Sequence, residues 1–294
     1  MPSAGWSGAS ISRCMDHGIP SRTALRVALR RAVHQIHDPG RVLDDPVTVR
    51  ILEATYPDAL RRAEVERNGG FAMAFRAFLI ARSRYAEDNL RRAFEGGIRQ
   101  YVLLGAGLDT FAYRNPYKEL RVFEVDHPAT QAWKRELLGK SGIALPENLT
   151  FAPVDFETQA LADQLRAARF DFASPAFFGW LGVVPYLTLE AFRTTVGLIA
   201  ALPAGTGVAL DYGQPREALP FAERVVRDGL AARVMRAGEP FRLFFTPGQI
   251  AAELRDFREI EDLGAAEINA LYFSGRRDGL RLKGASGRML CAWR

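Results

Sequence analysis

The sequence has little cysteine and no long apolar run. Its 294 residues include two cysteines, Cys14 and Cys291, near opposite ends of the chain, a spacing that indicates no disulfide framework. Free thiols are typical of a reducing compartment, so we expect a cytoplasmic protein. No window approaches the roughly 18 consecutive apolar residues that a membrane-spanning helix needs, and the first twenty residues show no signal peptide. We therefore expect no membrane partner.

Charge of one sign is not concentrated in any segment. The net charge is +5, from 39 basic and 34 acidic residues, and the two signs alternate in stretches such as 61–67 (RRAEVER). This alternation is typical of a solvated helix face, and no recognised nucleic-acid-binding module appears. We expect no nucleic-acid partner. The mildly positive net charge fits an acidic small-molecule substrate better than a nucleic acid.

A recognisable metal-binding motif is also missing. His34 and His37 are spaced so that a helix would place both imidazoles on one face, beside Asp38. No third ligand follows in a known pattern, so we predict no metal site and expect these residues to pack in the ordinary way.

What the sequence does contain begins with helices. Residues 1–20 are rich in glycine and serine and predict a disordered tail, and residues 21–294 predict a single domain. The apolar residues of the first helix recur at helical spacing, which favours packing on the domain over a membrane surface. The region 21–97 therefore predicts an N-terminal helical cap. Helices are predicted over residues 22–37, 46–57 and 71–97.

After residue 97, apolar strands alternate with helices of 10 to 15 residues, a pattern that predicts a parallel, doubly wound α/β sheet. The region 214–250 is predicted to be a helical, lid-like insertion over the substrate pocket. In it, Phe241, Phe244 and Phe245 are interpreted either as the lining of an apolar pocket or as core residues. Strands are predicted at 101–104, 121–126, 149–156, within 171–183, and at 205–213, 257–263 and 288–294.

The first strand ends in the turn Gly105-Ala106-Gly107. In a doubly wound sheet, ligands bind beyond the carboxyl ends of the strands, and glycine lets the backbone bend and approach a ligand closely. Glu124 and Asp126 end the second strand, where a carboxylate can accept hydrogen bonds from both ribose hydroxyls. Turn and acids together indicate a nucleoside cofactor and leave NAD and S-adenosyl-L-methionine both open.

The residues after the turn distinguish these cofactors. Thr110 stands where a dinucleotide fingerprint has a small residue, and Asp109 would face the pyrophosphate and repel it. A carboxylate near the ammonium group of S-adenosyl-L-methionine would instead be attractive, which favours that cofactor. Asp155 and Phe156 end the third strand, where they predict contacts with an adenine ring, although Asp155 is also a plausible cap for the following helix.

These segments together resemble the leucine carboxyl methyltransferase family. The resemblance covers roughly residues 75–200, and the combination of these motifs is specific for the family. That family includes enzymes that methylate the C-terminal carboxylate of protein phosphatase 2A catalytic subunits, and bacterial polyketide carboxyl methyltransferases of the tetracenomycin type. The segments that carry it are ARSRYAEDNL, RQYVLLGAGLDTFAYR, VFEVDHPATQAWK, VDF and GWLGVVPYLTLEAF.

The resemblance implies a class I methyltransferase with a Rossmann-like doubly wound sheet, mostly parallel with an antiparallel last strand. It implies that Arg82 holds the carboxylate of S-adenosyl-L-methionine, beside the substrate, and that Tyr186 belongs to the active site. One position departs from the family, where glutamate is common and this chain has Leu181. The resemblance also implies that Gly105 and Gly107 contact the methionine part of the cofactor and that Glu124 holds its ribose. Asp126 and Pro128 belong to the same sequence motif as Glu124. Asp155 and Phe156 are implied to contact the adenine.

The activity that follows is transfer of a methyl group to a carboxylate of a small molecule such as a polyketide or another secondary metabolite. A carboxylate is ionised at neutral pH and needs no general base, so catalysis would rest on proximity and orientation. Arg82, Arg84 and Tyr186 are candidates to orient it, with a surface salt bridge for Arg84 and core packing for Tyr186 as alternatives. Methylation of a phenol would need a base such as His127. Loss of transfer activity with retained cofactor binding is a further alternative.

Overall fold

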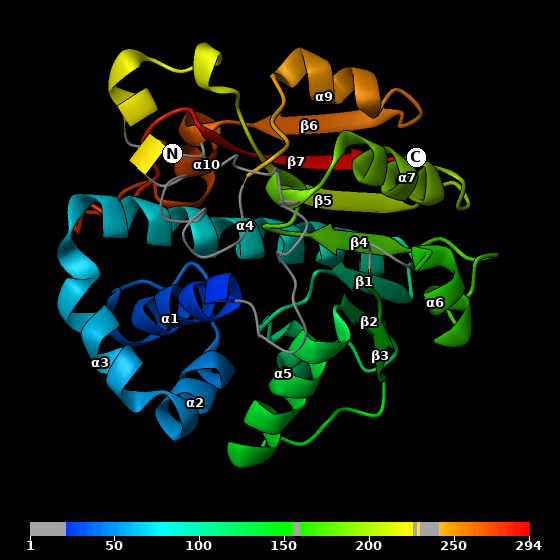
Figure 1. Cartoon of the computed structure of the whole chain (residues 1–294), viewed down its shortest axis with the longest axis horizontal. Helices are drawn as coiled ribbons and strands as arrows, with labels where there is room; N and C mark the ends of the chain where they lie inside the picture. The colour runs from blue at the N-terminus through cyan, green and yellow to red at the C-terminus, as the bar shows by residue number, and fades with distance from the viewer. Residues whose placement is uncertain (1–21, 156–158, 226–227, 230–240) are drawn as a thin grey trace, which may run out of the picture.

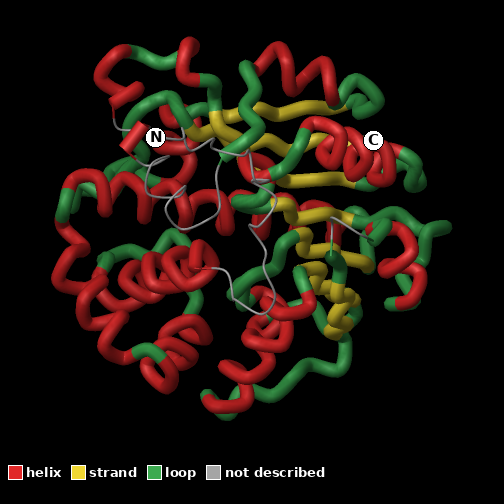
Figure 2. The backbone as a smooth tube through the Cα atoms, viewed as in Figure 1, coloured by secondary structure: helices red, strands yellow, loops and turns green. Residues whose placement is uncertain are grey.

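A computed structural model of the chain describes residues 22–155, 159–225, 228–229 and 241–294 (Figure 1). Seven strands form one twisted sheet in the order β3-β2-β1-β4-β5-β7-β6 (Figure 2). The first five strands pair in parallel, and β7 is antiparallel to both β5 and β6. The strands are β1 (Gln100–Leu104), β2 (Arg121–Asp126), β3 (Leu149–Pro153), β4 (Phe177–Trp180), β5 (Gly207–Gly213), β6 (Glu259–Leu263) and β7 (Gly287–Trp293).

Helices cover both faces of the sheet, as expected for strands joined by right-handed crossovers. Local sequence fixes where several begin. Pro128 opens α5, where a missing N–H costs nothing, and the Thr188 side chain caps α7 by accepting a hydrogen bond from Ala191 N. The helices are α1 (Arg22–His37), α2 (Pro46–Thr55), α3 (Pro57–Val65), α4 (Gly70–Glu95), α5 (Pro128–Lys140), α6 (Leu161–Ala167), α7 (Leu189–Ala200), α9 (Pro247–Glu253) and α10 (Ala265–Tyr272).

Strand β1 lies at the centre of the core and is buried along its whole length. Val102 and Leu104 pack into the cluster that includes α6 and α7, whereas Tyr101 and Leu103 pack into the cluster that includes α4. Successive side chains of a strand point to opposite faces, so this strand joins both cores. Its carboxyl end is therefore held rigidly.

The N-terminal helices form a separate apolar cluster at one side of the sheet (Figure 1). Residues of α1 and α2 pack there with α5 and with Leu108, in the turn after β1. The predicted helical cap thus contacts the turn directly. Within the described part of the chain, no helix combines the length and the apolar character needed to span a membrane.

The predicted fold is confirmed, including the antiparallel last strand, but two segments differ from the prediction. Strand β3 ends at Pro153 rather than at residue 156. Residues 241–246, inside the predicted helical insertion, contain no helix. Their backbone instead makes tertiary hydrogen bonds: Arg242 N donates to Pro185 O over 2.6 Å and Phe245 N to Gly213 O over 3.0 Å. These bonds replace those of a helix. The predicted tail lies outside the described residues.

Candidate functional site

The carboxyl ends of β1, β2, β4 and β5 meet at one edge of the sheet, where chain order reverses between β1 and β4. This is the position at which open α/β sheets bind ligands. Residues from four strand ends are brought together there. The predicted Gly105, Gly107 and Asp126 lie with two residues that were not predicted, Gly182 after β4 and Asp211 in β5.

Both glycines of the turn adopt left-handed backbone angles, with φ of 68° at Gly105 and 47° at Gly107. Protein atoms also approach both closely. A Cβ on Gly105 would overlap the Val183 side chain, and one on Gly107 would lie 3.2 Å from the Cβ of Ala24, in α1. The need for glycine thus arises from backbone conformation and from packing within the chain.

Asp126 connects the second strand to this turn. One carboxylate oxygen accepts a hydrogen bond from Gly107 N over 2.5 Å, and the other accepts from His127 N over 2.7 Å. Burial raises the pKa of Asp126, and the two backbone donors oppose this shift. The carboxylate therefore orders the turn, at the outermost residue of β2.

Glu124 lies one layer deeper and is fully buried. Lys134 Nζ lies 2.7 Å from its Oε2, and the Tyr113 hydroxyl donates to the same oxygen over 3.4 Å. The other oxygen, Oε1, has no hydrogen-bond partner among the described residues. Burial raises the pKa of Glu124 to about 7, although the nearby ammonium group of Lys134 lowers it.

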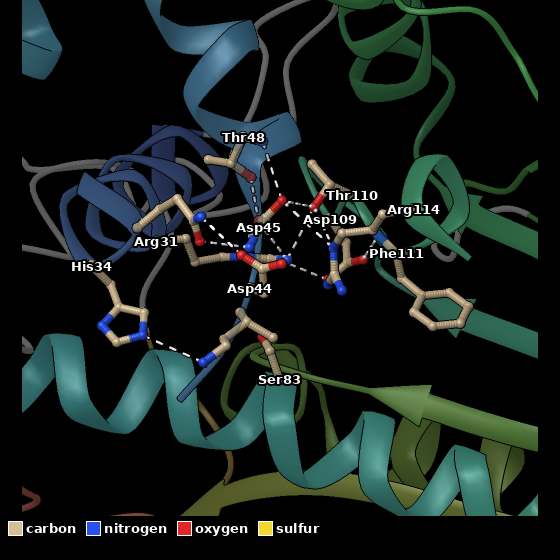
Figure 3. A network of polar contacts seen from close by, with 12 residues as sticks. Arg31, His34, Asp44, Asp45, Thr48, Ser83, Asp109, Thr110, Phe111 and Arg114 are labelled. Carbon is tan, nitrogen blue, oxygen red and sulfur yellow. Dashed lines mark hydrogen bonds and ion pairs between the residues drawn. The ribbon is translucent and has the colours of Figure 1, made fainter. Parts of the chain in front are cut away.

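Asp109 lies against the helical cap (Figure 3). Its Oδ2 lies 2.8 Å from Nη1 of Arg31, in α1, and its Oδ1 accepts a hydrogen bond from Phe111 N. Burial alone would raise the pKa of Asp109, but the positive charges of Arg31 and Arg114 outweigh this and lower it to about 2. Asp109 is thus an anion with partners inside the protein. Its predicted attraction to the cofactor's ammonium group remains a prediction.

The Arg31–Asp109 pair belongs to a larger buried network that the sequence reasoning missed (Figure 3). Arg31 also lies 2.8 Å from Asp45, and Asp45 accepts a hydrogen bond from the Thr110 hydroxyl over 2.6 Å. Arg114 Nη1 donates to Glu87, in α4, over 2.9 Å. The one available signal was the position of Arg31 on the arginine-rich face of the first helix.

Arg82 projects from α4 toward the loop after β4. It is 9% exposed, and its Nη1 lies 3.3 Å from Oδ2 of Asp211. Gly182 has φ of +70°, and a Cβ there would lie 2.6 Å from Nη1, so only glycine admits the guanidinium. Nε of Arg82 has no hydrogen-bond partner among the described residues. The group therefore retains a donor beside the strand ends.

Tyr186 lies in a short 3-10 turn (Val184–Tyr186) after β4. Its ring centroid is 5.3 Å from that of Phe241, which in turn packs edge-on against Phe244 at 6.2 Å. Phe245, by contrast, is buried in the core against Phe192. Phe241 thus lies beside Tyr186 and Phe244 beside Phe241, whereas Phe245 is a core residue, one of the two predicted roles.

The remaining predicted residues occupy different surroundings. Pro128 opens α5. Asp155 N donates to the Gln159 side-chain oxygen and Asp155 O accepts from Gln159 N. The N-cap of α6 is Ala160, so Asp155 does not hold the cap position. Phe156 lies outside the described residues. Arg84 forms a salt bridge with Asp88, as in its alternative interpretation.

The described histidines all have other partners. His34 pairs with Asp38, and its second ring nitrogen accepts a hydrogen bond from Val42 N. His37 contacts Glu64, and His127 Nδ1 accepts from Ala129 N at the start of α5. Across residues 22–155, 159–225, 228–229 and 241–294, no three His, Cys, Asp or Glu side chains cluster as metal ligands would.

A cavity of about 560 Å³ lies elsewhere, between α4, α10, β6 and the loop after α1. Arg84 lines it together with Asp88 and Tyr272, and no other predicted site residue that the structure describes does so. It therefore has no part in the crevice at the strand ends.

The family model described as leucine carboxyl methyltransferase matches residues 24–200. The chain belongs to the leucine carboxyl methyltransferase family. The predicted resemblance is thereby confirmed. The match includes most of the predicted cap, the glycine turn, Asp126 and Tyr186, whereas Asp211 lies outside it.

Individual relatives agree with this membership. A Bacillus subtilis protein named "Putative S-adenosyl-L-methionine-dependent methyltransferase YktD" is 36% identical over 208 residues, which cover 68% of this chain and 67% of that protein. A Parafrankia protein with the same type of name is 34% identical over 70% of this chain and 66% of its own length. The chain thus spans about two thirds of these relatives.

Solved structures support the fold. The crystal structure of a Thermobifida fusca protein described as a "putative methyltransferase" aligns with a TM-score of 0.58 at 20% identity, over 95% of this chain and 96% of that one. A DUF574 family protein from Streptomyces avermitilis aligns with a TM-score of 0.52 at 19% identity, over 92% and 97%.

Proposed function

We propose that this chain uses S-adenosyl-L-methionine to methylate the carboxylate of a small aromatic molecule, giving a methyl ester. The choice of a carboxylate as the methyl acceptor rests on the hydrogen bonds that the described histidines already make. His127 is the described histidine at the strand ends, and its Nδ1 is occupied as the cap of α5. A phenol or alcohol needs a base to remove its proton, whereas a carboxylate is ionised already.

The residues at the strand ends fit the methyl donor. Arg82 keeps a buried, unpartnered Nε that suits the donor's carboxylate. Asp126, at the outermost position of β2, is better placed for the ribose hydroxyls than Glu124, which lies two residues earlier in the strand and is fully buried. Asp155 follows β3 and suits the adenine edge. Gly105 and Gly107 keep the turn free of side chains.

S-adenosyl-L-methionine supplies an electrophilic methyl group on a sulfonium centre. A carboxylate oxygen of the substrate forms the new bond to the methyl carbon, and the carbon–sulfur bond breaks with its electron pair left on sulfur. No proton is released, so the protein's task is to hold the two reactants in line and to exclude water. Arg82 and the Tyr186 hydroxyl are the groups that orient the anions.

The acceptor side of the crevice favours an aromatic acid. Tyr186, Phe241 and Phe244 form a continuous aromatic group beside the loop that contacts Arg82. Aromatic side chains bind planar apolar ligands well, and a single cation beside them selects for a negative charge. A polyketide-type or other aromatic carboxylic acid has both properties.

The proposal is tested by incubating the protein with methyl-labelled S-adenosyl-L-methionine and a panel of aromatic carboxylic acids, with the matching phenols as a second panel. We expect label in products of the acid panel, and its release by mild alkali because esters hydrolyse under these conditions. The Arg82→Gln variant should lose transfer, whereas Arg84→Gln, two residues away in the same helix, should retain it. Alkali-resistant label would exclude a methyl ester.

A further inference from the structure

Asp211 lies at the carboxyl end of β5, is 4% exposed, and contacts two different elements. Its Oδ1 accepts a hydrogen bond from Gly182 N over 2.6 Å, and its Oδ2 lies 3.3 Å from Nη1 of Arg82. One carboxylate therefore fixes both the turn after β4 and the guanidinium that the turn admits. Both bonds are charge-assisted, and such bonds hold a geometry more firmly than neutral ones.

Arg82 is unusually constrained by this arrangement. Gly182 leaves no room beyond the guanidinium, since a Cβ there would lie between 2.6 and 3.0 Å from three of its atoms. The neighbouring residue, Leu181, is apolar and packs against the core cluster that includes α4, so it contributes no charge. Asp211 is the carboxylate that forms a salt bridge with Arg82 in the described part of the chain.

We propose that Asp211 is a positioning residue, which holds Arg82 so that its unpartnered Nε side faces the carboxylate of the bound methyl donor. This inference rests on the proposed function, because it assumes that S-adenosyl-L-methionine binds at these strand ends. Asp211 contacts neither cofactor nor substrate in this role. It acts through the direction in which it fixes the guanidinium.

Two ligands separate this role from a general structural one. S-adenosylhomocysteine has the amino-acid carboxylate that Arg82 would hold, whereas 5′-methylthioadenosine has the same nucleoside and lacks that carboxylate. In calorimetric titrations, Asp211→Asn should weaken binding of S-adenosylhomocysteine roughly tenfold, the scale of one charge-assisted contact. Binding of 5′-methylthioadenosine should stay within about twofold, because its contacts do not involve Arg82.

A double-mutant cycle makes the dependence on Arg82 explicit. In an Arg82→Gln background, Asp211→Asn should have no further effect on S-adenosylhomocysteine binding. Asp262→Asn is the matched control, since Asp262 also pairs with an arginine, Arg288, at 2.9 Å in another part of the sheet. That variant should leave both affinities unchanged.

Three other results of these titrations would contradict the proposed role of Asp211. Equal weakening of both ligands by Asp211→Asn, an effect that persists without Arg82, or tighter S-adenosylhomocysteine binding would overturn it. If Asp211→Asn does not fold, a wild-type crystal structure with S-adenosylhomocysteine decides, since Arg82 must contact both Asp211 and the ligand's carboxylate. Failure of wild-type protein to bind either ligand would instead refute the proposed function.

Discussion

The guanidinium of Arg31, in the first helix, lies 2.8 Å from the carboxylate of Asp109, in the turn after the first strand. The two residues are 78 positions apart. Their ion pair joins the N-terminal cap to the turn at the centre of the candidate site. The arrangement of the turn therefore depends on α1, a helix that supplies no predicted cofactor contact.

Replacing Arg31 by methionine should strongly destabilise the protein. The change removes the ion pairs of Arg31 with the buried Asp45 and the partly buried Asp109 and leaves Arg114 as their nearby cation. Breaking a buried ion pair typically costs about 3–5 kcal/mol. Equilibrium urea unfolding measures it. The control is Arg166→Met, which breaks an exposed pair with Asp163 and should cost about 1 kcal/mol or less. Equal effects of the two changes would argue against a buried network.

Acid should remove the contribution of Asp109. Its pKa is lowered from 3.8 to about 2 in the folded protein, so its ionised form stabilises the fold above pH 4. That contribution should be lost as the pH falls from about 4 to about 2, and a shift of this size corresponds to about 2 kcal/mol. Unfolding free energies measured across this range should fall less steeply in Asp109→Asn. Parallel curves for the two proteins would contradict the lowered pKa.

Glu124 should show the opposite dependence on pH. Its pKa is raised from 4.5 to about 7 by burial, which means that the folded protein prefers the protonated form. The resulting stabilisation is complete below about pH 4.5 and is lost as the pH rises through 7. Urea unfolding at a series of pH values should show this decline in wild-type protein and lack it in Glu124→Gln.

The partner of Glu124 provides an independent test. Lys134→Met should destabilise the protein near pH 8, because the buried Glu124 must then either stay ionised without its cation or take up a proton that the unfolded chain does not hold at that pH. The double variant Lys134→Met with Glu124→Gln should recover most of that loss, since no buried charge remains. Thermal unfolding of the three variants measures the recovery. A double variant as unstable as Lys134→Met would contradict this account.

Gly105→Ala should destabilise the glycine turn for two separate reasons. The left-handed backbone at φ of 68° costs a non-glycine residue about 1–2 kcal/mol, and the new methyl group overlaps Val183. Adding Val183→Ala should relieve the overlap and leave the backbone cost. Gly139→Ala, on an exposed turn of α5 with open space around it, should stabilise by about 0.5–1 kcal/mol. Chemical denaturation compares all three.

Local patterns were sufficient for the strands and for the α/β class, whereas the antiparallel last strand was implied by the family resemblance. All seven strands were predicted because apolar runs and intervening helices are visible in the sequence, and the first helix was placed at residues 22–37 as observed. The conformation of the segment 241–246 was not predicted, because hydrogen bonds to Pro185 and Gly213 determine it. Such partners lie far away in the sequence, and helical periodicity carries no information about them.

The candidate site was predicted less completely for the same reason. The glycines and Asp126 follow strands directly, so topology alone brings them together. The pairing of Asp109 with Arg31, and of Arg82 with Asp211, joins residues separated by 78 and 129 positions. The charges of these side chains indicate that they need partners of opposite charge, but the sequence does not identify those partners.

The position of β7 in the sheet also imposes an order on folding. Strand β6 pairs with β7 and with no other strand in the described part of the chain, and β7 follows it in the sequence by more than twenty residues. During synthesis β6 must therefore wait, with both of its edges unpaired, until β7 inserts between it and β5. An unpaired edge is a site for aggregation, and two of the five residues of β6 are glutamates (Glu259 and Glu261), whose charges oppose association while the strand waits.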